Sequence, residues 1–177
     1  RKAEEVLKRA KKIVDEVDKK NRESLERTRK IVEDVNEENR EVLDRLRRRA
    51  EELKKEVDDE RVKRMLDEIL KEVKKRIEEV VRRNEAVIEE SRRLVEELSE
   101  RNRELVKRLE EVVRREDSDD VVRRIEEVIE KARRENDESV RRDEKLMKEV
   151  KDENKKTVDD IRRLLKDIED KVREAKR

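Results

Sequence analysis

The sequence predicts an all-α fold, an antiparallel up-down-up bundle of three long, nearly straight helices. Two features of its composition and one of its spacing lead to this prediction. Its 177 residues include no glycine and no proline, so almost no position requires a positive or a locked φ angle. Charged residues, most of them good helix formers, make up 62% of the chain, and the 31% that are hydrophobic recur with a helical period. High charge also suits disordered chains, but the strict periodicity favours helices.

The first predicted helix, residues 1–57, repeats its apolar positions every 18 residues. Leu7, Leu25 and Leu43 form one row, and Val17 and Val35 belong to another. Because 18 residues make five turns at about 3.6 residues per turn, the apolar stripe runs parallel to the helix axis. A strict seven-residue repeat would instead produce a left-handed supercoil. The spacing therefore predicts a nearly straight helix.

The second and third predicted helices, residues 60–116 and 119–176, continue the lattice at other angular positions. Val73 and Leu109 share a row in the second, and Val122 and Val158 share one in the third. Counted at about 100° per residue, the stripe jumps by roughly half a turn at each junction. One continuous helix would therefore point its apolar face to opposite sides in successive thirds. Breaks are expected near residues 58–60 and 116–119, where aspartates and Ser118 suit the N-termini of the helices that follow.

Connections this short place consecutive helices antiparallel to each other. Each helix has about 57 residues and is expected to be about 85 Å long at 1.5 Å per residue. No linker composition suggests a boundary within the chain. Residues 1–177 are therefore predicted to form a single domain.

Thirteen polar residues occupy positions that the lattice otherwise fills with Val, Ile, Leu and Ala. They are Asn21, Ser24, Thr28, Asn39, Asn84, Ser91, Ser99, Asn102, Asn136, Ser139, Asp143, Asn154 and Thr157. In the predicted bundle, residue n of the first helix lies level with about residue 117 − n of the second and 119 + n of the third. This register places Asn21 near Ser99, Asn102, Asn136 and Ser139; Ser24 and Thr28 near Ser91 and Asp143; and Asn39 near Asn84, Asn154 and Thr157.

A polar network of this kind favours one arrangement of the helices over others. A core made only of Val, Ile and Leu can pair in several registers or oligomeric states. A buried Asn or Ser must find a partner, or it costs about 1–3 kcal/mol of desolvation. Asn carries donors and acceptors, and Ser and Thr hydroxyls rotate, so these residues can close networks across three helices. The thirteen residues are therefore interpreted as structural, as the source of a specific register.

Asp143 is the only ionisable residue on a core row. One hypothesis is a carboxylate that binds a proton or a metal ion and has a raised pKa. The alternative is an acceptor for Ser or Thr hydroxyls, or a partly exposed residue at the edge of the core. Catalysis would require a second competent group in a pocket, and the sequence shows none. The structural interpretation is therefore favoured.

No catalytic, cofactor-binding or metal-binding residue is predicted, no cofactor is expected, and the chain is not expected to be an enzyme. Without His or Cys it has neither the Glu-x-x-His motif of bundle metal sites nor a zinc spacing. The 55 basic and 54 acidic side chains are interspersed, and there are no aromatic residues, which disfavours nucleic-acid binding. No apolar run is long enough for a membrane span or a signal peptide.

Taken together, these features resemble de novo designed helical bundles with buried hydrogen-bond networks. The features are the 18-residue lattice, the stacked Asn, Ser and Thr layers, the aliphatic core, the Glu/Lys/Arg surface and turns such as residues 117–120. The resemblance covers the whole chain, although it lacks the loop glycines usual in designs. It implies a stable scaffold with no natural biochemical function, which requires no partner and is soluble in the cytoplasm of an expression host.

Two alternatives stay open. An apolar arc of about 120° suits a four-helix packing as well as a three-helix one. The chain would then be an interaction module, either part of a split bundle that binds a further helix or half of a homo-oligomer. In that case one groove would expose an apolar strip and unpaired Asn or Ser groups. A natural coiled coil of the spectrin sort is less favoured, because such repeats usually contain Trp, Gly and irregular loops.

Overall fold

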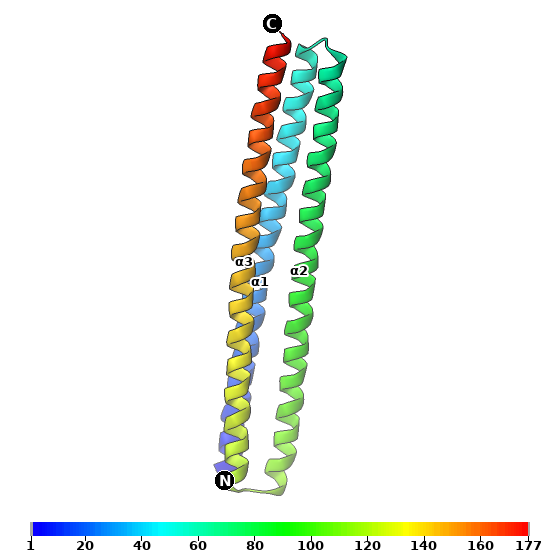
Figure 1. Cartoon of the computed structure of the whole chain (residues 1–177). Coiled ribbons are helices and arrows are strands. Elements are labelled where there is room, and N and C mark those ends of the chain that lie inside the picture. The colour runs from blue at the N-terminus through cyan, green and yellow to red at the C-terminus, as the bar shows by residue number, and fades with distance from the viewer. Residues whose placement is uncertain (1, 177) are drawn as a thin grey trace. The chain divides into compact units, whose positions relative to one another are not determined.

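The structure, a computed structural model, describes residues 2–176 and is a bundle of three long α-helices (Figure 1). The helices are α1 (Lys2–Glu56), α2 (Glu60–Arg115) and α3 (Asp119–Ala175). The predicted all-α three-helix fold is therefore confirmed. The helix ends differ from the predicted ends by at most one residue, and residue 1, the predicted start of the first helix, lies outside the described range.

The contacts between the helices divide the chain into two compact units, and each unit contains a segment of all three helices. Among the described residues, unit 1 comprises 2–29 and 88–146, and unit 2 comprises 30–87 and 147–176. Each unit is described by itself below. The organisation of the chain as a single domain stays a prediction.

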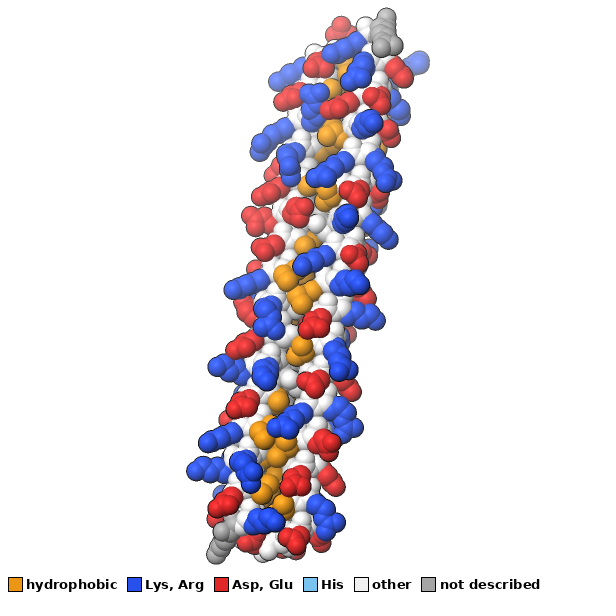
Figure 2. Space-filling view, turned by 90° about the vertical axis from the view of Figure 1, so that its left-hand side faces the viewer, with side chains coloured by type: hydrophobic (Ala, Val, Ile, Leu, Met, Phe, Trp, Pro, Cys, Tyr) orange, Lys and Arg blue, Asp and Glu red, His pale blue; other side chains and the backbone are white. Residues whose placement is uncertain are grey.

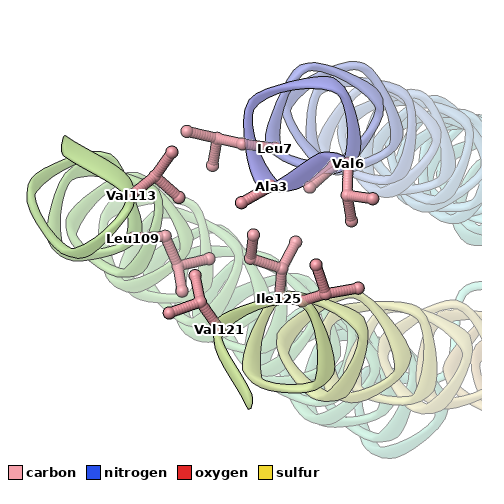
Figure 3. Close-up of a cluster of buried hydrophobic side chains, with 9 residues drawn as sticks. Ala3, Val6, Leu7, Leu109, Val113, Val121 and Ile125 are labelled. Carbon is pink, nitrogen blue, oxygen red and sulfur yellow. The ribbon is translucent and has the colours of Figure 1, made fainter. Parts of the chain in front are cut away.

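The aliphatic core of unit 1 is built by all three helices. Ala3 and Leu7 of α1, Leu109 of α2, and Val121 and Ile125 of α3 point toward one another in Figure 3 and are almost completely buried. A second cluster of this unit consists of Val14, Val17 and Ala132. Burying one Val, Leu or Ile side chain contributes about 1.5–3 kcal/mol of transfer free energy. The lattice positions identified in the sequence therefore supply the packing of this unit.

Unit 2 has an equivalent core at the end of the bundle where α1 and α2 are joined. One cluster includes Leu46, Ile77 and Ile161, one residue from each helix. The other includes Leu66 and Ile168. The residues of both clusters fall on the 18-residue rows, so helical periodicity alone places them inside.

Side chains from the short loops cap the helices that follow them. The Asp59 carboxylate accepts a hydrogen bond from the backbone N–H of Arg61 at the start of α2, with a distance of 2.9 Å. The Ser118 hydroxyl oxygen accepts one from the N–H of Val121 in α3, at 3.3 Å. The first N–H groups of a helix have no partner within the helix, so these bonds stabilise the starts of α2 and α3. No residue in the described chain has a positive φ, which explains how turns without glycine can form.

Charged side chains cover the outer faces of the helices, and aliphatic side chains lie in the grooves between them. Figure 2 shows orange hydrophobic side chains flanked by rows of Lys, Arg, Asp and Glu. Over residues 2–176 no large hydrophobic side chain is exposed. None of the helices, as far as the structure describes them, contains a stretch long and apolar enough to span a membrane.

Candidate functional site

Fourteen polar residues are buried in the described chain, and they form one cluster in each unit. The unit 1 polar cluster consists of Asn21, Ser24, Thr28, Ser91, Ser99, Asn102, Asn136, Ser139 and Asp143. The unit 2 polar cluster consists of Asn36, Asn39, Asn84, Asn154 and Thr157. All thirteen residues singled out in the sequence are among them. The remaining one, Asn36, was not singled out.

The shortest hydrogen bond of the unit 1 polar cluster joins α3 to α1. The Ser139 hydroxyl donates to the side-chain oxygen of Asn21 over 2.6 Å, and both residues are buried. The guanidinium of Arg142 approaches the same hydroxyl oxygen from the surface at 3.4 Å. The Ser139 hydroxyl therefore acts as both donor and acceptor, which ties a core amide to an exposed cation.

A second bond of this cluster joins α1 to α2. The Arg22 guanidinium donates to the Ser99 hydroxyl over 3.1 Å and also pairs with Asp18 one turn earlier in α1. Ser91 and Asn102, also on α2, are buried but make no side-chain hydrogen bond to any residue within 2–176. Among the described buried polar residues of α2 in unit 1, Ser99 is thus the one whose side chain is hydrogen-bonded to α1.

Asp143 lies against α1 and is completely buried. The Ser24 hydroxyl donates to one of its carboxylate oxygens, Oδ2, over 3.1 Å. Thr28 lies one turn after Ser24 in α1, but its hydroxyl donates to the backbone oxygen of Ser24, at 2.9 Å, rather than to Asp143. The second oxygen, Oδ1, is buried and has no partner. Burial raises the pKa of Asp143, and the Ser24 hydrogen bond and the positive charge of Arg142 only partly oppose this shift.

In the unit 2 polar cluster the central bond joins α2 to α1. The Asn84 side-chain amide donates to the side-chain oxygen of Asn36 over 3.0 Å, and both are buried. On α3, the Asn154 amide donates to the Glu38 carboxylate of α1 at 3.3 Å. Thr157 donates to a backbone oxygen of its own helix at 3.0 Å and makes no bond to another helix. Each pair of bonded side chains here joins α1 to one neighbour.

Several buried polar atoms have no hydrogen-bond partner. They are Nδ2 and Oδ1 of Asn39, and one oxygen each of Asn136, Asp143 and Asn154. The sequence predicted that Asn39 would meet Asn84, Asn154 and Thr157, but Asn84 bonds Asn36 and Asn154 bonds Glu38. An unpaired buried polar group costs about 1–3 kcal/mol. The polar residues are therefore buried together in each unit, but their hydrogen bonds leave Asn39 without a partner.

The register between α1 and α3 agrees with the predicted offset, whereas that between α1 and α2 differs from it by one turn. Within unit 1, Asn21 contacts Ser139, as an offset of about 119 requires. Lys11 pairs with Glu110, although residue 106 is the predicted neighbour. In unit 2 the displacement has the same size, because Lys54 pairs with Asp67 rather than residue 63.

The pairing of α2 with α3 keeps the predicted register, although these helices are also antiparallel. In unit 1 Arg101 pairs with Glu135, and in unit 2 Arg83 pairs with Glu153. Residues 135 and 153 are the neighbours that the predicted offsets give for Arg101 and Arg83. The one-turn displacement is therefore seen in the pairs that join α1 to α2.

Sequence reasoning missed Asn36 because its row also contains Asp18 and Lys54, which are charged. That row lies at the edge of the apolar arc, and its other two members are half-buried. Asn36 is three residues before Asn39, so the two lie on neighbouring positions of one helical face. This three-residue spacing from Asn39 is the feature of the sequence that could have identified Asn36 as a buried polar residue. Glu38 carried no comparable signal, because it is an exposed residue that reaches Asn154 with its carboxylate.

The chemistry available in both clusters is hydrogen bonding of buried amides and hydroxyls, with one buried carboxyl group in unit 1 and with charged partners at the surface: Arg22, Arg142 and Glu38. Over the described residues no group of three or more His, Cys, Asp or Glu is arranged so that it could hold a metal ion. Asp143 contacts a hydroxyl but no second ionisable group in the core. No protein-family model, curated protein or solved structure matches this chain.

Proposed function

We propose that the chain is a designed structural scaffold with no catalytic activity, in which buried polar side chains specify how the helices pair. One observation carries the proposal: in each unit, buried polar groups of different helices bond each other. Ser139 bonds Asn21 in unit 1, and Asn84 bonds Asn36 in unit 2. A change of register would separate these pairs and leave buried groups without partners.

Two further findings support a self-contained scaffold. A groove of unit 2, with a volume of about 590 Å³, lies between α1 and α2. Its floor consists of Leu43, Ile77 and Val81, and each of these is at most 7% exposed. A docking surface for another protein would need a larger apolar area than such buried side chains offer. The regular 18-residue lattice and the absence of matching proteins support a designed origin.

The proposal predicts that removing polar groups loosens specificity without unfolding the protein. The test is the triple variant Asn21→Leu, Asn102→Leu and Asn136→Leu in unit 1. We expect it to keep or raise the melting temperature, because apolar groups replace three buried amides. The Ser139 hydroxyl, which loses Asn21, can bond a backbone oxygen of its own helix, as the hydroxyls of Thr28 and Thr157 do. We also expect light scattering to show additional oligomers of the variant, whereas we expect the parent protein to be a monomer with the 21.7 kDa mass of one chain.

A matched control places the same number of leucines on the surface, at Glu23, Glu104 and Glu138, which are exposed. If this control associates as strongly as the core variant, the loss of specificity does not come from the core. If the core variant unfolds at ordinary temperature, the polar residues are needed for stability and the proposal is wrong.

A second candidate function is an interaction module that binds another copy or a further helix. The groove between α1 and α3 in unit 1 favours it. A cavity of about 300 Å³ there is lined by Ile13, Val17 and Asn136, and the side-chain oxygen of Asn136 has no partner. Half-buried Ile13 packs at the edge of the core beneath this cavity. A partner helix with a hydroxyl or amide donor would fit this combination of apolar and polar groups.

The mass of the parent protein distinguishes the two candidates. A monomer at every concentration supports the scaffold, and a concentration-dependent dimer supports the interaction module. In the second case Ile13→Glu is expected to abolish association. Leu165→Glu, at a half-buried groove position of unit 2, is the matched control and is expected to leave association unchanged.

A further inference from the structure

Asp143 is the only ionisable residue that is buried in the described chain, and it is 0% exposed. It lies in the middle of α3, within unit 1. No Lys or Arg of the described chain forms an ion pair with it. An ionised carboxylate without a counter-charge is far more costly to bury than a neutral carboxylic acid.

The groups that face Asp143 from the other two helices are neutral. On α1 these are Ser24, whose hydroxyl donates to Oδ2 at 3.1 Å, and Thr28, whose hydroxyl bonds a backbone oxygen. On α2, the Arg101–Glu135 ion pair places residue 93 level with Asp143, and the buried residues on either side of it are Ser91 and Val95. The charged residues at this level of α2 are exposed: Glu89, Glu90, Arg92, Arg93 and Glu96.

On its own helix, the nearest cation is Arg142. Its guanidinium bonds the Ser139 hydroxyl at 3.4 Å, and the residue is exposed. Only one oxygen of Asp143 has a donor, while Oδ1 is buried without one. A carboxylate has about four lone-pair sites to satisfy, so a single hydroxyl leaves most of the negative charge uncompensated.

We propose that Asp143 is a proton-binding site. Its carboxyl group takes up a proton when unit 1 folds, and the loss of this proton loosens the packing of unit 1. The unit 2 polar cluster contains only amides and a hydroxyl, so it has no equivalent group. Loss of the proton is therefore expected to weaken unit 1 selectively.

The way in which the stability of unit 1 depends on pH follows from the direction of the pKa shift of Asp143. Burial raises the pKa of Asp143 above its ordinary value, despite the opposing effects of the Ser24 hydrogen bond and of Arg142. The folded state thus binds more protons than the unfolded state between the two pKa values. The contribution of Asp143 to stability is complete below the ordinary Asp pKa and is lost as the pH rises through the raised pKa. Within that window the folding equilibrium changes by up to about tenfold per pH unit.

The first measurement is a carbon-13 NMR titration of the side-chain carboxyl groups in the parent protein. We expect Asp143 to titrate above the ordinary range of an aspartate, because its carboxyl group is buried. A titration of Asp143 within or below that ordinary range overturns the proposal. This measurement needs no variant, so it does not depend on how a substitution folds.

The second measurement compares hydrogen exchange of the two units as a function of pH, after correction for intrinsic exchange rates. We expect amide protection in unit 1 to fall relative to unit 2 as the pH rises, and this trend to vanish in Asp143→Asn. Asp137→Asn is the matched control on the exposed face of α3 and is expected to retain the trend. Equal pH dependence in both units, or a trend that persists in Asp143→Asn, contradicts the proposal.

Discussion

Asp117 accepts a hydrogen bond from the backbone N–H of Ala3 across 3.2 Å, although 114 positions separate the two residues. The carboxylate stands in the loop between α2 and α3, and the N–H belongs to the first turn of α1. A loop residue therefore satisfies a donor that α1 cannot satisfy itself. Its negative charge also lies near the positive end of the α1 dipole.

Replacing Asp117 with alanine is expected to destabilise the protein by about 0.5–2 kcal/mol, as the loss of an N-terminal cap does. Chemical denaturation measures the loss, and hydrogen exchange near Ala3 locates it. Asp58→Ala, in the other loop, removes an exposed carboxylate that makes no hydrogen bond in the described structure. An equal loss in both variants would show that charge, rather than the bond to Ala3, is responsible.

Replacing Asn39 with valine is expected to raise the free energy of unfolding by about 1–3 kcal/mol. Both polar atoms of this side chain are buried and unpaired, and valine removes the cost of their desolvation. Val35 and Val42 are buried valines of the same helix on either side of Asn39, so a β-branched residue suits the inner face of α1. Urea denaturation of the two proteins measures the difference.

Asn36→Val is the matched comparison, and it is expected to have the opposite sign. Asn36 accepts the amide of Asn84, which this change would leave buried without a partner. We expect a loss of about 1–3 kcal/mol. If both valine variants stabilise the protein, the Asn36–Asn84 bond contributes nothing to stability.

The bond between Ser139 and Asn21 is expected to give a coupling energy of about 0.5–1.5 kcal/mol in a double-mutant cycle. The cycle uses Ser139→Ala, Asn21→Ala and the double variant. Ser91, which is buried and has no side-chain bond in the described structure, provides a control cycle with Asn21. Coupling of the same size in the control cycle would show that burial, not the bond, links these sites.

Leu46→Ala is expected to cost about 2–5 kcal/mol, because it creates a cavity in the core of unit 2. Leu46 is 1% exposed and packs with residues of all three helices. Leu165→Ala, at a half-buried groove position of the same unit, should cost clearly less, since solvent can fill the space. Thermal denaturation ranks the two variants, and equal losses would argue against a distinct core at Leu46.

Most of the fold is predictable from local rules. The 18-residue spacing of Leu7, Leu25 and Leu43 marks one face of a helix, and the half-turn jumps mark where the chain turns back. The aspartates and Ser118 at the breaks cap helices because short polar side chains reach the first free N–H groups. These rules depend only on residues that are close in the sequence, so they can be applied without knowing the tertiary structure.

The candidate site is less predictable, because hydrogen bonds depend on positions accurate to less than one helical turn. The sequence alone determined that three helices form and that polar residues such as Asn21 and Ser139 occupy their inner faces. Only the tertiary structure decided that Asn84 bonds Asn36 and leaves Asn39 without a partner. The physical reason is that hydrogen-bonded atoms must approach within roughly 3.2 Å, whereas the pairs that join α1 to α2 lie about one turn from the register that the sequence predicts.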